Sequence, residues 1–141
     1  RTSPHPMMTL FDAPGRESSC VQRSRTSTSS QSLALFNETQ RMETARKLAE
    51  RLIKYDKQDK ARMEYLFSLL TSRKPKTAEA NALSELLGQS KDRFAESPED
   101  ANEILSQGLS PKDDSLESAE VAAWTQVAAT VLASDPAILL Y

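Results

Sequence analysis

The chain has 141 residues, of which 38% are hydrophobic and 6% aromatic, with 18 basic and 20 acidic side chains. This length allows one domain with one core, and three glycines with so few aromatic residues disfavour a β-sandwich or β-barrel. One cysteine excludes an internal disulfide, and one histidine, His5, excludes most catalytic and metal-binding sites built from such side chains.

Charge is distributed unevenly along the chain. Residues 1–76 carry 15 basic and 8 acidic side chains, a net charge of +7, whereas residues 77–141 carry 3 and 12, a net charge of −9. The basic residues lie beside acidic ones at helical spacing and without interleaved aromatic residues, so no nucleic-acid partner is predicted. The two halves are expected to attract each other, or one of them to face a partner.

No membrane span is predicted, because polar residues and Pro136 interrupt the most apolar stretch, residues 121–140. Residues 1–30 lack the apolar core of a signal peptide. Since the chain opens with Arg1 and not methionine, we expect it to be part of a longer polypeptide whose targeting signal lies upstream.

Residues 1–27 are predicted to be an extended, irregular segment. Residues 1–32 contain 12 serines and threonines, three prolines and neither the helical nor the strand period. Apolar side chains such as Met8 and Phe11 need cover, and residues 12–15 have the composition of a turn. We therefore expect this segment to pack on the helical body or on an upstream domain.

Residues 28–141 are predicted to form an α-helical domain. Thr28 and Gln31 have the spacing of a capping box, and Asn37 and Gln40 repeat it at the start of the longest helix. The six predicted helices begin near Thr28, Asn37, Lys57, Thr77, Ser97 and Asp114.

The predicted helix ends follow from proline and glycine. Pro75 is expected to stop the third helix and Pro136 the last one. The fourth is expected to end near Gly88 or to fray towards Phe94. Short loops between these elements predict an all-α fold, an antiparallel bundle of four main and two short helices, with Trp124 in its core.

Five charged residues in the N-terminal segment are the candidate binding residues. They are Asp12, Arg16, Glu17, Arg23 and Arg25. Arginines in a coil rich in hydroxyl groups can bind an anion or an acidic sugar through forked contacts. Equally, they can pair with the two acidic residues and cap carbonyl groups, which would pin the segment to the bundle.

The chain shows no catalytic constellation and no cofactor site. Cys20 lies between Arg16 and Arg23, which would lower the pKa of its thiol, but no base stands near it in sequence, so a structural thiol is favoured. Covalent haem needs a Cys-x-x-Cys-His run, which the chain lacks. No metal site and no cofactor are therefore predicted within these residues.

Several sequence blocks together resemble a known family. The blocks are FDAPGRE (11–17) with Cys20, RTST (25–28), QSLALFN (31–37), ARKLAER (45–51), GLSP (108–111) and AAWT (122–125) leading to Val131 and Leu132. This set resembles the C-terminal domain of unknown function in large planctomycete proteins that carry a cytochrome-c-like module. Members of that family usually have Pro-Leu at positions 29–30 and Asp-Pro at 38–39; these are helix starts, so the fold expectation is unchanged.

The resemblance implies a periplasmic or otherwise extracytoplasmic parent with haem c in its upstream part. It carries over no catalytic residue. We interpret the chain as a non-catalytic helical accessory domain at the C-terminal end of such an envelope protein, with the upstream domain as its partner. The alternative is a shared site for a carbohydrate or anionic substrate, formed by the candidate residues with the upstream domain.

Overall fold

The computed structural model describes residues 5–14, 21, 26 and 28–138, and this part of the chain contains helices, turns and loops but no strand. The helices are α1 (Pro6–Leu10), α2 (Ser29–Phe36), α3 (Thr39–Tyr55), α4 (Asp59–Thr71), α5 (Thr77–Glu96), α6 (Pro98–Leu105), α7 (Ser118–Leu132) and α8 (Asp135–Ile138). Four long and two short helices are those predicted, so the all-α bundle is confirmed; α1 and α8, each of about one turn, were not predicted.

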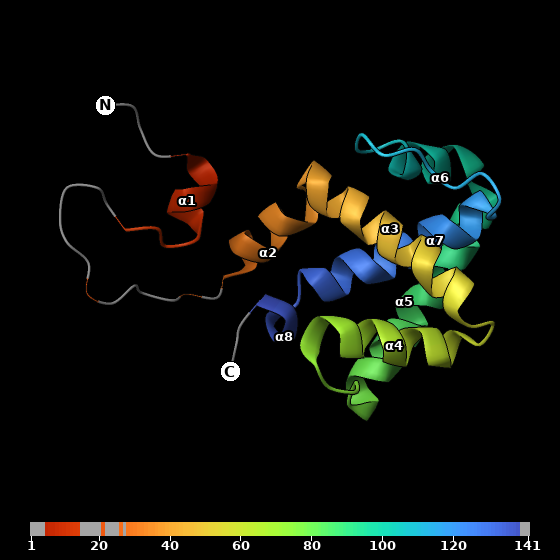
Figure 1. Cartoon of the computed structure of the whole chain (residues 1–141), viewed down its shortest axis with the longest axis horizontal. Helices are drawn as coiled ribbons and strands as arrows, with labels where there is room; N and C mark the ends of the chain where they lie inside the picture. The colour runs from red at the N-terminus through yellow and green to blue at the C-terminus, as the bar shows by residue number, and fades with distance from the viewer. Residues whose placement is uncertain (1–4, 15–20, 22–25, 27, 139–141) are drawn as a thin grey trace.

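Helix α7 is the centre of the bundle, with α3, α5 and α6 packed along it (Figure 1). Nine of its residues between Val121 and Val131 are buried. Small side chains such as Ala122 and Ala123 let the neighbouring helices approach closely, and Trp124, with 0% of its surface exposed, fills the space between them. The apolar stripe predicted for this helix is therefore the core of the domain.

Two arginines show that α3 and α7 run antiparallel. Arg41, near the start of α3, donates a hydrogen bond of 2.7 Å to the carbonyl of Leu132 at the end of α7. Arg62 of α4 donates to the carbonyl of Ile53 near the end of α3 (3.4 Å) and to Glu120 near the start of α7 (2.6 Å). Opposite ends of the two long helices therefore meet.

One predicted helix start agrees with the structure, and the next one does not. Thr28 and Gln31 form the predicted capping box of α2. Asn37 does not cap α3, because its N–H donates back into α2 and so belongs to the end of that helix. Glu38 caps α3 instead, accepting a hydrogen bond of 3.1 Å from the N–H of Arg41.

The helix ends depend on backbone conformation and burial more than on proline. Helix α4 ends at Thr71, and Ser72, which follows it, adopts a left-handed conformation (φ 58°) before Pro75 is reached. Helix α5 passes Gly88 and continues to Glu96, because Phe94 is buried with only 1% of its surface exposed. Burial of one large ring outweighs the weak helix preference of one glycine.

The chain end also differs from the prediction. Helix α7 ends at Leu132, where the Ser134 hydroxyl donates to the carbonyl of Val131 (2.6 Å), and Pro136 lies within α8 instead of ending α7.

In the described part of the N-terminal segment, α1 interrupts the coil predicted for residues 1–27. None of the helices in the described residues combines the length and apolarity that crossing a membrane requires.

Candidate functional site

The predicted binding residues fall in the segment that precedes α2. Asp12 is described, whereas Arg16, Glu17, Arg23 and Arg25, together with Cys20, lie outside the described residues. The predicted contacts of the arginines with an anion or a sugar therefore stay predictions.

Asp12 holds the N-terminal segment to the start of α2. One of its carboxylate oxygens accepts hydrogen bonds from the N–H (2.9 Å) and the hydroxyl (2.6 Å) of Thr26. The Gln31 side chain then donates to that hydroxyl oxygen (3.0 Å) and to the carbonyl of Leu10 (2.8 Å). Since Gln31 also belongs to the capping box of α2, the sequence blocks around residues 12, 26 and 31 form one connected network.

A second network, which we name the α3 clamp, holds the loop before α7. It consists of side chains on one face of α3 that bind the loop of residues 108–113: Glu43, Arg46, Lys47, Glu50 and Lys54. The clamp joins two sequence blocks, residues 45–51 and 108–111, that are separated by more than fifty residues. It gives both blocks a structural role.

Glu43 binds the first turn of the loop. Its carboxylate accepts hydrogen bonds from the N–H groups of Leu109 (2.9 Å) and Ser110 (2.9 Å) and from the Ser110 hydroxyl. These donors, the hydroxyl foremost, hold the pKa of Glu43 below its usual value. The turn also needs Gly108, whose φ is +96° and whose Hα faces the Glu43 side chain.

Arg46 is the buried charge of the clamp, with 1% of its surface exposed. Its guanidinium donates to the carbonyl of Ser110 (2.6 Å) and lies 3.4 Å from the Glu50 carboxylate. Glu50 in turn accepts hydrogen bonds from Lys47 (2.8 Å) and from the N–H of Asp113 (3.2 Å). The buried arginine is thus matched by a carboxylate and a carbonyl, as a charge removed from water requires.

The clamp closes on the solvent side with an ion pair between Lys54 and Asp113. The lysine, with additional hydrogen bonds from Ser115, holds the pKa of Asp113 well below its usual range. The same pair raises the pKa of Lys54. The ion pair therefore favours the charged form of both groups.

Arg62 forms a third network, which the sequence analysis did not single out. It donates to the carbonyl of Asp56 (2.5 Å) and to Glu120 (2.6 Å), and its guanidinium carbon lies 5.9 Å from the centre of the Trp124 ring. It thereby ties the loop between α3 and α4 to the start of α7. No short-range pattern marks a pair such as Arg62 and Glu120, which are 58 residues apart.

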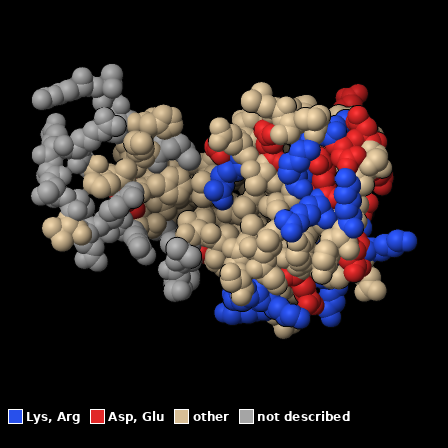
Figure 2. Space-filling view, viewed as in Figure 1, with Lys and Arg blue, Asp and Glu red and all other residues tan. Residues whose placement is uncertain are grey.

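One end of the molecule has no charged side chain on its helices. Helices α1 and α2 contact each other and contain no Asp, Glu, Lys or Arg; we name them the neutral end. Figure 2 shows the charged side chains of the described residues gathered over the bundle. Met8 and Leu33 are 50% and 62% exposed there.

Metal binding has no support in the described residues, where no three His, Cys, Asp or Glu side chains are grouped to hold an ion. The charged networks instead bind backbone groups and each other. They can rigidify loops and fix how neighbouring helices meet.

Comparison with known proteins gives one match. A family described as PSD1, protein of unknown function (DUF1553), matches residues 1–87, well over half of the chain. The chain belongs to the DUF1553 family. No curated protein and no solved structure matches it. The DUF1553 match includes the neutral end and the side chains of the α3 clamp, and it ends within α5, before the clamped loop and α7.

Proposed function

We propose that this chain is a non-catalytic helical domain that docks through its neutral end on the upstream part of a larger protein. The observation that carries the proposal is the absence of charge from α1 and α2 together with the exposure of Met8 and Leu33. The centres of protein interfaces are depleted of charged residues and contain apolar anchors. The neutral end has both properties.

The charged networks support the non-catalytic part of the proposal. In the α3 clamp, Glu43, Arg46 and Glu50 are all engaged with the loop that follows α6. A general base or a nucleophile needs a position open to substrate. Side chains that bind one another and backbone groups serve the fold instead.

For the parent protein, we propose the context implied by the resemblance, an extracytoplasmic planctomycete protein with a cytochrome-c-like module. Haem c would be bound upstream, because His5 and Cys20 are the only His and Cys of this chain and do not form the Cys-x-x-Cys-His run. Reading the coding region before Arg1 tests this context. A Cys-x-x-Cys-His run behind a signal peptide is expected, and an initiator methionine directly before Arg1 would overturn it.

Docking is tested by adding the chain to the separately expressed upstream part of its parent and measuring affinity by calorimetry. Leu33→Asp places a charge at an exposed position of α2 and should weaken binding at least tenfold. The control is Leu69→Asp, since Leu69 is also exposed but lies on α4. Equal affinities of wild type and Leu33→Asp would contradict docking through the neutral end.

A further inference from the structure

Two tyrosines stack on each other at the surface between α3 and α4. The rings of Tyr55, the last residue of α3, and Tyr65 of α4 have centres 4.1 Å apart and planes inclined by 10°. Tyr55 is 55% exposed, whereas Tyr65 is partly buried and packs against the core. Because one face of the Tyr55 ring covers Tyr65, its exposed surface is the other face and the edge. The pair therefore offers one flat aromatic face to a ligand.

Arg51 lies beside this pair. It is exposed, it stands one helical turn before Tyr55, and its guanidinium carbon is 5.4 Å from the centre of the Tyr65 ring. Within the described part of the chain, this guanidinium forms no ion pair and no hydrogen bond. The ring restrains the side chain, so its fork of N–H groups is oriented before an acceptor arrives.

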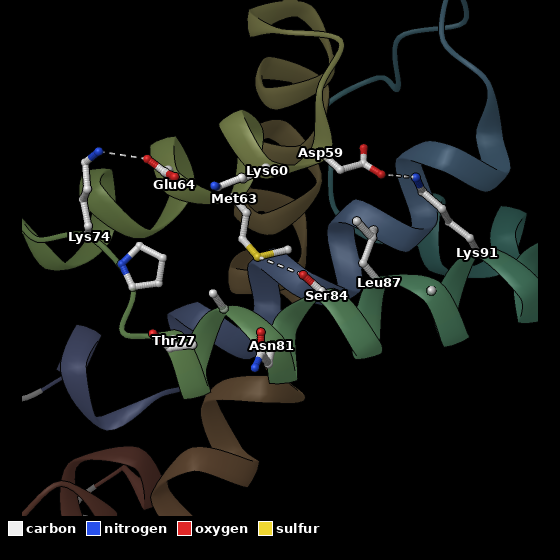
Figure 3. A pocket seen from close by; sticks show the side chains of 13 residues that line it. Asp59, Lys60, Met63, Glu64, Lys74, Thr77, Asn81, Ser84, Leu87 and Lys91 are labelled. Atoms are coloured by element: carbon white, nitrogen blue, oxygen red, sulfur yellow. Dashed lines mark hydrogen bonds and ion pairs between the residues drawn. The ribbon is translucent and has the colours of Figure 1, made fainter.

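The neighbouring carboxylates do not neutralise Arg51, because they are bound elsewhere. On α4, Asp59 pairs with Lys91 (2.6 Å) and Glu64 pairs with Lys74 (3.0 Å), both on the side that faces α5 (Figure 3). The two glutamates of α3 belong to the α3 clamp. An anion at Arg51 would therefore meet a positive charge that no described carboxylate balances.

A sugar ring with a carboxylate matches this combination of groups. The C–H groups on one face of a pyranose ring are apolar and carry a slight positive charge, whereas the face of an aromatic ring is negative. A carboxylate at the edge of the sugar can accept two parallel hydrogen bonds from one guanidinium. Arg51 and Tyr55 are neighbours on the helix surface, with about 6 Å between Cβ atoms at this spacing. One uronic acid residue can span that separation.

The size of the site favours a sugar over a protein or a nucleic acid. A stable protein interface buries about 800 Å² on each partner, whereas one aromatic side chain contributes about 150–250 Å². Single-stranded nucleic acid stacks successive bases on separate rings along a groove lined by several cations. Here the two rings stack on each other, and Arg51 is the one cation of the described residues placed over either of them.

We propose that Arg51, Tyr55 and Tyr65 form a binding site for a uronic acid residue of an acidic sugar chain. The sugar ring lies on the exposed face of Tyr55, and its carboxylate binds the guanidinium of Arg51. Tyr65 supports both side chains. The site is separate from the neutral end and from the candidate binding residues of the N-terminal segment.

The experiment is an NMR titration of the whole chain with a pentamer of galacturonic acid. The amide signals of Tyr55 and Tyr65 and the side-chain N–H signals of Arg51 should shift until saturation, with a Kd of about 1 mM or tighter, as for one small contact. Cellopentaose, a neutral sugar chain of the same length, should bind at least tenfold more weakly. Lack of a saturable shift up to about 10 mM pentamer, or shifts confined to other residues, would overturn the proposal.

Variants separate the two contacts. Arg51→Gln and Tyr55→Ala should each weaken pentamer binding at least fivefold, whereas Tyr55→Phe keeps the ring and should bind within twofold of wild type. The matched control is Lys57→Gln, which removes an exposed cation that has no cation–π contact with either ring. It should change the affinity less than twofold. Equal weakening by Arg51→Gln and Lys57→Gln would show attraction to net charge alone and would overturn the site.

Other ligands give distinct results. An oligothymidine that shifts the same signals at lower concentration than the pentamer would make the site one for nucleic acid and overturn the proposal. So would a wild-type dimer in sedimentation that Tyr55→Ala dissociates, because a second copy would then cover the ring. Leu33→Asp should leave pentamer binding unchanged, so this site and docking at the neutral end can fail independently.

Discussion

Glu43 on α3 accepts hydrogen bonds from the N–H groups of Leu109 and Ser110, which lie 66 and 67 residues further along the chain. Helix α3, which supplies part of the core, thus also holds a loop that is distant in the sequence. Because the loop leads directly into α7, the clamp sets how the central helix enters the bundle. The charged side chains on this face of α3 are therefore bound to the loop and do not form a free surface.

Glu43→Ala should release the first turn of this loop. The N–H groups of Leu109 and Ser110 lose their acceptor, so their amide hydrogens are expected to exchange roughly tenfold faster, the factor that corresponds to one charge-assisted hydrogen bond. Hydrogen exchange followed by NMR measures both sites directly. Amides in the middle of α5 serve as the internal control, and unchanged exchange at residues 109 and 110 would contradict the clamp.

Two glycines should respond to alanine with opposite signs. Gly88 is helical and its added Cβ meets nothing within 4 Å, so Gly88→Ala should raise the free energy of unfolding by up to about 1 kcal/mol. Gly108 has φ +96°, and its added Cβ would lie within 2.7 Å of the Glu43 Cβ atom, so Gly108→Ala should lower it by at least about 1 kcal/mol. Urea unfolding of both variants decides the matter, and changes of the same sign would refute this account.

The sequence predicts those parts of the fold that depend on local interactions. The capping box of Thr28 and Gln31 and the apolar stripe around Trp124 are properties of a few neighbouring residues, and the structure contains both. Helix limits set by tertiary burial were missed. Helix α5 extends to Phe94 and beyond because of contacts with other helices, which no local signal at Gly88 reveals.

The same distinction applies to the candidate sites. Arg46 and Arg62 bind partners 58 or more residues away, so their roles follow only from the packed bundle. The sequence blocks at residues 45–51 and 108–111 contain parts of the α3 clamp, but no contact between them was predicted.

Acid should weaken the turn between α4 and α5. Two hydrogen bonds from Arg73 (2.7 and 2.8 Å) and one from the N–H of Lys76 lower the pKa of Glu79 from 4.5 to about 2. The folded carboxylate stays ionised where the unfolded one takes up a proton. Its contribution to stability is therefore fully present above about pH 4.5 and is lost as the pH falls towards 2.

The measurement is the Tm of wild type and Glu79→Gln between pH 6 and pH 2.5. The wild type should be the more stable at pH 6, and the difference should shrink steadily below pH 4.5. Arg73→Gln should likewise remove the part of the stability that is lost below pH 4.5, because it removes the largest cause of the lowered pKa of Glu79. A constant difference across the whole range would show that Glu79 acts through packing alone.

Truncation of Trp124 should be among the most costly single changes in the bundle. The ring is fully buried and lies under the Arg62 guanidinium, so Trp124→Ala leaves a large cavity and should lower the free energy of unfolding by about 3–5 kcal/mol. Trp124→Phe should cost clearly less, because the indole N–H has no hydrogen-bond partner among the described residues and a phenyl ring refills much of the space. Urea unfolding monitored by circular dichroism gives both values, since the variants lack the only tryptophan. A loss below about 1 kcal/mol for Trp124→Ala is the size expected at a surface position and would place the ring outside the core.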